Sequence, residues 1–168
     1  MPEHLLYIGG RWRPGESGTA PAVSPSSGRQ FATVAVASPA DVDAAVAAAR
    51  AAQPGWAALS AFDRAAWCLA VAAAIEARRD DLAHALTEDQ GKPLAAEARD
   101  EVAELAEYFR MAAEDAKRLA GMIPPSAAAG RRVLITTVPL GVVAVVSPWN
   151  WPYTMGAELF APARPPRR

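Results

Sequence analysis

The segment with the clearest chemical potential is Ser147–Pro152, which follows an apolar stretch, Val142–Val146. Pro148 and Pro152 restrict the backbone here, so Asn150 is expected to lie on a stiff loop. A carboxamide N–H held in such a position can donate a hydrogen bond to an oxyanion that develops during a reaction. The alternative is that Asn150 only satisfies backbone groups of the loop, as loop asparagines commonly do, and both interpretations stay open at this point.

The other candidate residues for chemistry are one cysteine, Cys68, and two histidines, His4 and His84. A lone cysteine excludes an intramolecular disulfide and a cysteine-based metal cluster, and the two histidines have no metal-ligand spacing. Cys68 lies in an alanine-rich stretch, residues 65–75, with no neighbour in the sequence that would stabilise a thiolate. We therefore expect Cys68 to pack in the core and not to act as a nucleophile.

The charge balance excludes some classes of partner. The 168 residues carry 17 Lys and Arg against 18 Asp and Glu, which gives a net charge of −1. Such a chain has no field that would attract nucleic acid or an anionic membrane surface, so neither is expected as a partner. The N-terminus, Met1–Ile8, lacks a basic stretch followed by an apolar one, and the longest apolar run is too short to span a bilayer. A cytoplasmic protein is expected.

Short strands and alanine-rich helices are expected to precede the asparagine loop. Of the 168 residues, 41 are alanine, which favours closely packed helices. Leu5–Ile8 and Phe31–Val36 have the pattern of strands, and the Pro-, Gly- and Ser-rich stretch of residues 13–30 is expected to be a loop. A helix is predicted to begin after Ser38, which forms a capping pattern with the aspartate three residues later, and to end at Pro54.

Three further helices are predicted from the sequence. One begins after Ser60 and runs toward Arg79, a shorter one covers Leu82–Gln90 and ends before a glycine, and the longest runs from Leu94 to about Ala120. Gly121 is the predicted C-terminal cap of the longest helix. Apolar residues recur along that helix at spacings of three and four. Its solvent-facing side is expected to carry Glu97, Glu101 and Glu104.

After residue 130 the pattern changes to strands. Arg132–Val138 and Val142–Val146 are predicted strands, and a helix is predicted from Tyr153 to Ala161. Val142–Val146 has no polar alternation, so both of its faces should be covered, as in a parallel α/β sheet. Ligands of such sheets collect at the carboxyl ends of the strands, which is where the asparagine loop lies.

Several motifs, in order along the chain, closely resemble the aldehyde dehydrogenase superfamily over about residues 5–163. The resemblance implies an α/β fold: the N-terminal part of the family's fold, with a small β segment, Ala-rich helices, an oligomerisation-type strand, and then the first strand and helix of an incomplete Rossmann-like domain. The corresponding divisions are residues 1–130, 131–141 and 142–163. The matching motifs are Tyr7–Trp12, Ser24–Gly28, Ser38–Asp41, Glu88–Leu94, Pro139–Val143 and Ser147–Pro152.

The resemblance also implies a reaction, the oxidation of an aldehyde to a carboxylic acid with NAD or NADP. In that reaction a cysteine thiolate attacks the aldehyde, an asparagine side chain and a backbone N–H hold the oxyanion, and a glutamate activates water. Asn150 matches that asparagine, and Ser147, Pro148 and Trp149 match residues that line the cofactor cleft. The family's nucleophile and base have no match here, so the chain alone is expected to be inactive and to bind the cofactor weakly or not at all.

The similarity to the family changes at Arg164. Residues 164–168, Arg-Pro-Pro-Arg-Arg, cannot continue the family's helix, and we expect an aberrant tail on an N-terminal fragment, as from a frameshifted or prematurely ended gene. The alternative is a protein that pairs with a full-length relative, or with a second copy of itself, through Arg132–Val138. An exposed edge strand pairs readily, which favours such an interaction.

Overall fold

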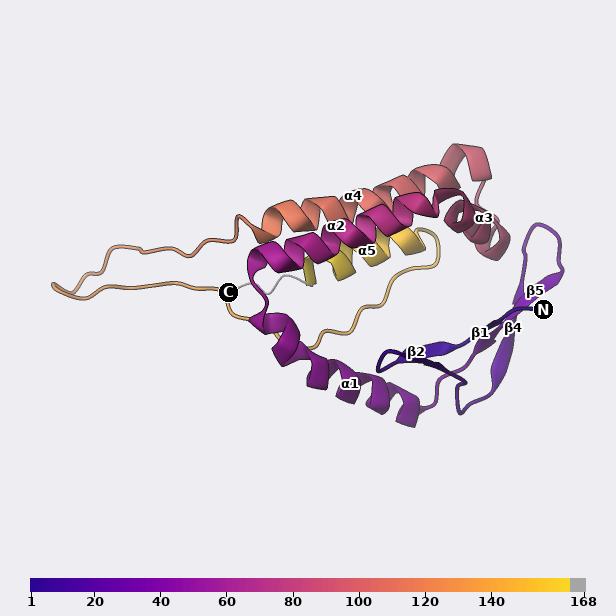
Figure 1. Ribbon diagram of the computed structural model, residues 1–168, viewed down its shortest axis with the longest axis horizontal. Coiled ribbons are helices and arrows are strands. Elements are labelled where there is room, and N and C mark those ends of the chain that lie inside the picture. The colour runs from indigo at the N-terminus through magenta and orange to yellow at the C-terminus, as the bar shows by residue number, and fades with distance from the viewer. Residues whose placement is uncertain (164–168) are drawn as a thin grey trace.

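The computed structural model describes residues 1–163, which form two small sheets, a set of packed helices and a long extended arm (Figure 1). The fold class is α/β, as predicted, and the predicted aberrant tail, residues 164–168, lies outside the described residues. The elements in chain order are β1 (Glu3–His4), β2 (Leu6–Ile8), β3 (Arg11–Arg13), β4 (Thr19–Val23), β5 (Gln30–Ala35), α1 (Pro39–Ala58), α2 (Ala61–Ala77), α3 (Arg79–Gln90), η1 (Leu94–Ala98), α4 (Arg99–Ala116) and α5 (Pro152–Ala163).

The larger sheet has the strand order β1-β5-β4, with β1 parallel and β4 antiparallel to the central β5. β2 and β3 form a separate hairpin around Gly9 and Gly10, whose φ values of 61° and 80° suit the tight turn between them. The prediction that residues 13–30 form only a loop is wrong, because β4 lies within them. β4 is an edge strand, and an edge strand tolerates Pro21, which has no N–H to donate.

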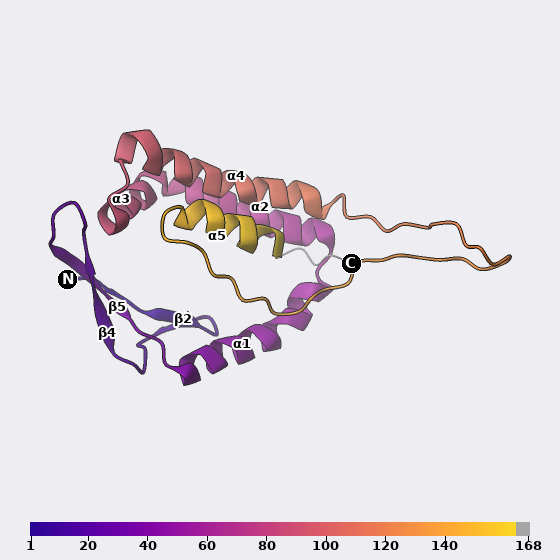
Figure 2. The ribbon, with the colours of Figure 1, turned by 180° about the vertical axis from the view of Figure 1, so that it is seen from behind.

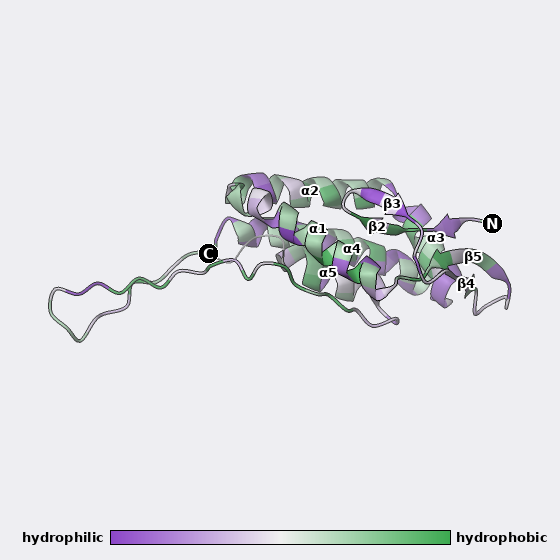
Figure 3. Cartoon of the chain, turned by 90° about the horizontal axis from the view of Figure 1, so that it is seen from below, coloured by the Kyte–Doolittle hydropathy of each residue, from purple (hydrophilic) through white to green (hydrophobic). Residues whose placement is uncertain are grey.

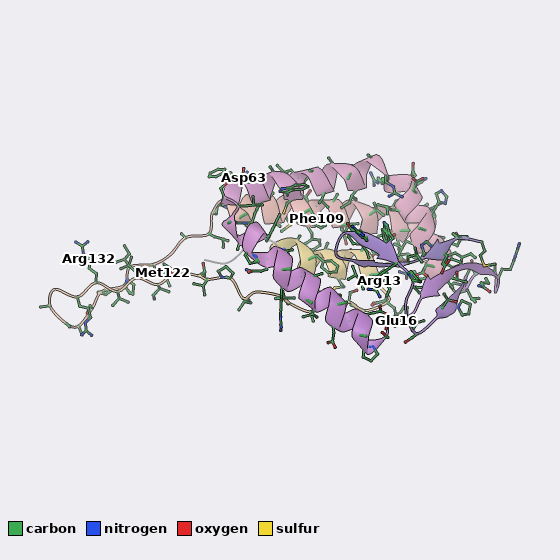
Figure 4. All side chains as sticks on the ribbon, turned by 60° about the horizontal axis from the view of Figure 1, so that its bottom comes forward. Arg13, Glu16, Asp63, Phe109, Met122 and Arg132 are labelled. Atoms are coloured by element: carbon green, nitrogen blue, oxygen red, sulfur yellow. The ribbon has the colours of Figure 1, made fainter. Side chains whose placement is uncertain are left out.

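α1 begins where Ser38 and Asp41 cap each other, as predicted. The Ser38 hydroxyl accepts a hydrogen bond from Asp41 N at 3.1 Å, and Asp41 Oδ2 accepts one from Ser38 N at 2.9 Å. Asp41 is buried, accepts a further bond from Glu16 N at 2.9 Å, and lies 3.0 Å from Arg13 Nη2, so the cap also ties α1 to β3 (Figure 4). The backbone N–H of Glu16, that of Ser38 and then the Arg13 guanidinium hold the pKa of Asp41 below its usual value.

The prediction that this helix ends at Pro54 is wrong, because α1 continues to Ala58. Proline removes one helical hydrogen bond, but its ring fixes φ near the helical value, so the helix can keep its path. The helix ends at an extended residue, Leu59, and Ser60 then caps α2 by accepting from Asp63 N at 3.1 Å, as predicted. Within residues 1–163 no single helix is long and apolar enough to cross a membrane; α1 and α2 reach that threshold only together and meet at a bend of 119°.

The helical core forms where α4 packs against α2 and α5 (Figures 1 and 2). Phe109 is its one large aromatic side chain among the buried residues described, and most of the others are alanines, which let the helices approach closely. Cys68 lies in this core with 1% of its surface exposed, which confirms that it is a packing residue. The buried residues of the core are Ala65, Cys68, Ala72, Ala106, Phe109, Ala112, Ala113, Ala116, Ala157 and Ala161.

The longest predicted helix is interrupted and ends early. Its first five residues form η1, a π-helical turn in which Ala98 N donates to Pro93 O at 3.0 Å. α4 then ends at Ala116, so Gly121 is not its cap. Gly121 instead precedes a pair of hydrogen bonds between Met122 and Ile135, of 3.0 and 2.9 Å. A Cβ at position 121 would lie 2.6 Å from Ile135 O, and this close approach explains the glycine.

Residues 118–146, called the arm below, leave the helices as an extended excursion (Figures 1 and 3). Among the described residues, strand-type pairing in the arm is limited to Met122 and Ile135, and Figure 4 shows Met122 and Arg132 far from the helical core. The predicted strands Arg132–Val138 and Val142–Val146 are therefore wrong for this chain. A strand needs a neighbour to pair its N–H and C=O groups along its length, and among residues 1–163 these two segments have such a partner only at Ile135.

Candidate functional site

The asparagine loop, residues 147–151, connects the arm to α5. Its first four residues, Ser147 to Asn150, are exposed, and Trp149 is 81% exposed. Within the described part of the chain, neither the Asn150 carboxamide nor the backbone N–H groups of these residues form a hydrogen bond. The alternative role of Asn150, in satisfying the loop's own backbone, therefore has no hydrogen bond to support it. The amide is available to an external acceptor, and its role as an oxyanion donor stays a prediction.

The residue that follows Asn150 is anchored. Trp151 is half-buried, and Lys92 Nζ lies 3.6 Å from the centroid of its ring, in the geometry of a cation–π contact. Lys92 is 5% exposed and lies in the turn after α3, where Gly91 ends the helix with a φ of 77°. Trp151 O accepts a hydrogen bond from Met155 N at 3.0 Å, which joins the loop to the first turn of α5.

Lys92 is also half of a buried ion pair. Its Nζ lies 2.5 Å from Glu101 Oε2, and the two side chains are 4% and 0% exposed. The prediction that Glu101 faces solvent is therefore wrong. A carboxylate is buried at tolerable cost only when it is paired and hydrogen-bonded, and Glu101 is both. A signal was present in the sequence, since Glu101 lies three residues after Ala98 and four before Leu105, on the apolar face of the helix.

The second oxygen of Glu101 binds the start of α5. Glu101 Oε1 accepts hydrogen bonds from Tyr153 N at 2.9 Å and from Thr154 N at 3.3 Å. A negative charge is favourable at this end of a helix, where the N–H groups have no partner within the helix. The Thr154 hydroxyl adds a bond to Glu104 Oε2 at 2.8 Å. The group formed by Lys92, Glu101, Trp151 and these two N–H donors is called the anchor below.

Two tyrosine hydroxyls also hold α5 in place by hydrogen bonds, one near its start and one further along. The Tyr153 hydroxyl donates to Leu82 O at 3.3 Å, and burial followed by the charge of Glu101 raises the pKa of Tyr153. The Tyr108 hydroxyl donates to Glu158 Oε1 at 2.9 Å, and this hydrogen bond raises the pKa of Tyr108. Both phenols therefore stay protonated at neutral pH and act as hydrogen-bond donors that hold α5 against α3 and α4.

An apolar groove lies elsewhere on the molecule. It has a volume of about 490 Å³, runs between α1 and the end of the arm, and is lined by Trp56, Val143 and Phe160 among others. No residue of the asparagine loop lines it, so the groove and the loop are separate features.

Comparisons with known proteins identify the family of the chain. Residues 12–164 match the aldehyde dehydrogenase family. Glutarate-semialdehyde dehydrogenase of Pseudomonas putida is 36% identical over 158 residues, which are 94% of this chain and 33% of that protein. The succinate-semialdehyde dehydrogenase [NADP(+)] of Escherichia coli is 35% identical over 157 residues, 93% of this chain and 32% of that protein.

Solved structures show the same likeness. The succinate-semialdehyde dehydrogenase of Burkholderia pseudomallei superimposes with a TM-score of 0.93 and 38% identity, over 97% of this chain and 34% of the other. The structure of PnpE in complex with nicotinamide adenine dinucleotide gives a TM-score of 0.92 and 35% identity, over 98% and 34%. This chain thus spans about a third of the length of these relatives. The match includes both the asparagine loop and the anchor, and the chain belongs to the aldehyde dehydrogenase family.

Proposed function

We propose that this chain carries the oxyanion-binding part of an NAD(P)-dependent aldehyde dehydrogenase, with Asn150 as the donor. The carboxamide of Asn150 donates to the substrate oxygen as that oxygen gains negative charge. The observation that carries the proposal is the exposed and unbonded carboxamide of Asn150, one residue before an anchored tryptophan, in a chain of this family. A donor held in advance stabilises the charge without the cost of reorganising at the moment of reaction.

The cofactor proposed for this family site is NAD or NADP, which accepts the hydride when bound. Ser147, Pro148 and Trp149 fit one wall of its cleft, because they are exposed and the N–H groups of Ser147 and Trp149 form no hydrogen bond with described residues. The first N–H groups of α5 do not fit a phosphate, since Glu101 already occupies them. One wall buries too little of a dinucleotide for tight binding, so we expect this chain alone to bind it weakly or not at all.

We further propose that the 168-residue chain alone does not oxidise aldehydes. Its one cysteine, Cys68, is 1% exposed and packs inside α2 against α4, so it is out of reach of a substrate. Losing the nucleophile of a covalent mechanism typically costs many orders of magnitude in rate. Aldehyde-dependent NADH formation by the purified chain, removed by Cys68→Ala, would contradict this.

A chimera tests the role of Asn150. Residues 12–164 of this chain replace the matching third of the Escherichia coli succinate-semialdehyde dehydrogenase, and kcat is measured with and without Asn150→Ala. We expect kcat to fall about 100- to 1000-fold with little change in KM, which is the usual cost of one oxyanion donor. His84→Ala, at an exposed residue of α3, is the control and should leave kcat unchanged. An Asn150→Ala chimera with full kcat would overturn the proposal.

One observation favours a second candidate function, pairing with a full-length relative or a second copy through Arg132–Val138. Leu134 is 67% and Val138 68% exposed in that segment, and apart from the pairing of Ile135 with Met122 its backbone forms no hydrogen bond with described residues, which leaves it available to a neighbouring strand. Sedimentation of the chain alone, and mixed with the Escherichia coli relative, should show complexes that disappear when residues 132–138 are replaced by a Gly-Ser linker. Complexes that survive this replacement would count against pairing through the segment.

A further inference from the structure

We propose that Lys92 and Glu101 are positioning residues that hold the asparagine loop in place. The inference deepens the proposed function and rests on it for the role of Asn150, whereas the mechanical part concerns only this chain's own contacts. Both residues lie outside the asparagine loop, in the turn after α3 and in α4.

The ion pair between Lys92 and Glu101 is costly to bury. Both side chains are almost completely buried, and burying two charges offsets most of the attraction between them. A pair of apolar residues of similar volume would fill the same space with similar stability. What the charged pair adds is therefore geometric, because Lys92 and Glu101 fix the positions of the other groups that they contact.

The two residues divide the contacts within the anchor between them. Glu101 uses one oxygen for Lys92 and the other for Tyr153 N and Thr154 N. Lys92 places its charge against the ring of Trp151. The two residues thus hold both the last residue of the asparagine loop and the first turn of the following helix.

Among the described residues, backbone hydrogen bonds reach the asparagine loop from its C-terminal side alone. Residues 140–150 form no backbone hydrogen bond with any described residue, whereas the hydrogen bonds resume at Trp151. On the N-terminal side of Asn150, no described residue back to Leu140 is fixed by a backbone hydrogen bond. Its position is therefore determined from its C-terminal side, through Trp151 and the anchor.

Amide hydrogen exchange of the full chain by NMR tests this without cofactor or activity. In Glu101→Ala, exchange at Tyr153 N and Thr154 N should accelerate about tenfold or more, since each donor loses a charged acceptor. Glu101→Gln keeps an acceptor oxygen and should show a smaller acceleration. Lys92→Met should broaden or shift the side-chain signals of Trp151 and Asn150. Lys92→Arg keeps the positive charge and should restore those signals. Glu104→Ala, one turn along the same helix, is the matched control and should leave Tyr153 N unchanged, because among residues 1–163 Glu104 accepts a hydrogen bond from the Thr154 hydroxyl alone.

Two results would overturn the proposal. One is exchange at Tyr153 N and Thr154 N within twofold of the unsubstituted chain in both Glu101 variants. The other is an equal loss of protection at Ala106 and Ala113 in α4, which would mean that the pair stabilises the helices in general. Failure of the proposed function is separate, since it appears in the Asn150→Ala chimera and leaves these exchange rates untouched.

Discussion

The helical core and the arm both have a high proportion of apolar residues, but the core buries them and the arm exposes them. Val102 in α4 is 1% exposed, whereas Val146 in the arm is 88% exposed. Helices satisfy their backbone hydrogen bonds internally and need only a packing partner, which α2, α4 and α5 provide for one another. A strand needs a second strand, and among the described residues the arm has only the single pairing of Met122 with Ile135. The lesson is that apolar sequence specifies a buried element only where its hydrogen-bonding partner is also present.

The largest expected effect compares one side chain from each region. Phe109→Ala in the core should reduce the free energy of unfolding by about 3–5 kcal/mol, because it leaves a cavity among alanines that cannot refill it. Val146→Ala in the arm should change it by less than about 0.5 kcal/mol. Urea unfolding followed by helical circular dichroism measures both. Similar losses for the two variants would mean that the arm is packed in solution.

The next comparison is between two sets of tryptic sites. Arg131 and Arg132 lie exposed in the arm, whereas Arg110 lies in α4 and is bound to Glu76 and Glu107. Cleavage in the arm should be faster on the order of 100-fold, because a helix must open locally before a protease can bind it. Timed digestion with mass spectrometry gives the order of the cuts. The comparison would be contradicted if the C-terminal part from Arg131 resisted trypsin as well as α4 does. The exposed apolar residues of the arm should also make the chain prone to aggregate.

A smaller effect separates two helix caps that share the pattern of a serine followed three residues later by an aspartate. The pKa of Asp41 is lowered in the folded chain, so its carboxylate stabilises the fold above the ordinary value of about 3.9, and this contribution is lost as the pH falls through the lowered folded value. Asp41→Asn should therefore lower the urea midpoint at pH 7, and the difference from the unsubstituted chain should shrink below about pH 4. Asp63→Asn, at the exposed cap of α2, is the matched control with a weaker effect. A midpoint difference for Asp41→Asn that does not shrink as the pH falls below about 4 would contradict the assignment.

The sequence predicted the elements whose signals are local. The Ser38 and Ser60 caps, the glycine after α3 and the helix after the asparagine loop all depend on residues within one turn, and all were correct. The resemblance of motifs in order along the chain also predicted the family correctly.

The errors share a physical cause, which is that distant residues decided the outcome. β4 exists because β5 lies beside it, so Pro21 is tolerated at an edge that no local rule reveals. Gly121 serves a close approach to Ile135 and not a helix end. The local pattern predicts that Glu101 faces solvent with Glu97 and Glu104, but a lysine nine residues earlier and the start of α5 supply its charged and hydrogen-bonding partners inside the fold. Asn150 could be singled out from the sequence, but its anchor could not.

The most direct test of the account is the amide exchange profile of the unsubstituted chain across residues 140–156. The central claim is that the asparagine loop joins an unheld segment to an anchored one, with the boundary at Trp151. We predict rapid exchange from Leu140 to Asn150 and marked protection at Tyr153, Thr154 and Met155, which donate to Glu101 and Trp151. Uniform protection across the range would show that the arm is paired and the loop is held from both sides. Uniformly rapid exchange would show that the anchor does not hold the start of α5. Either result would contradict the account.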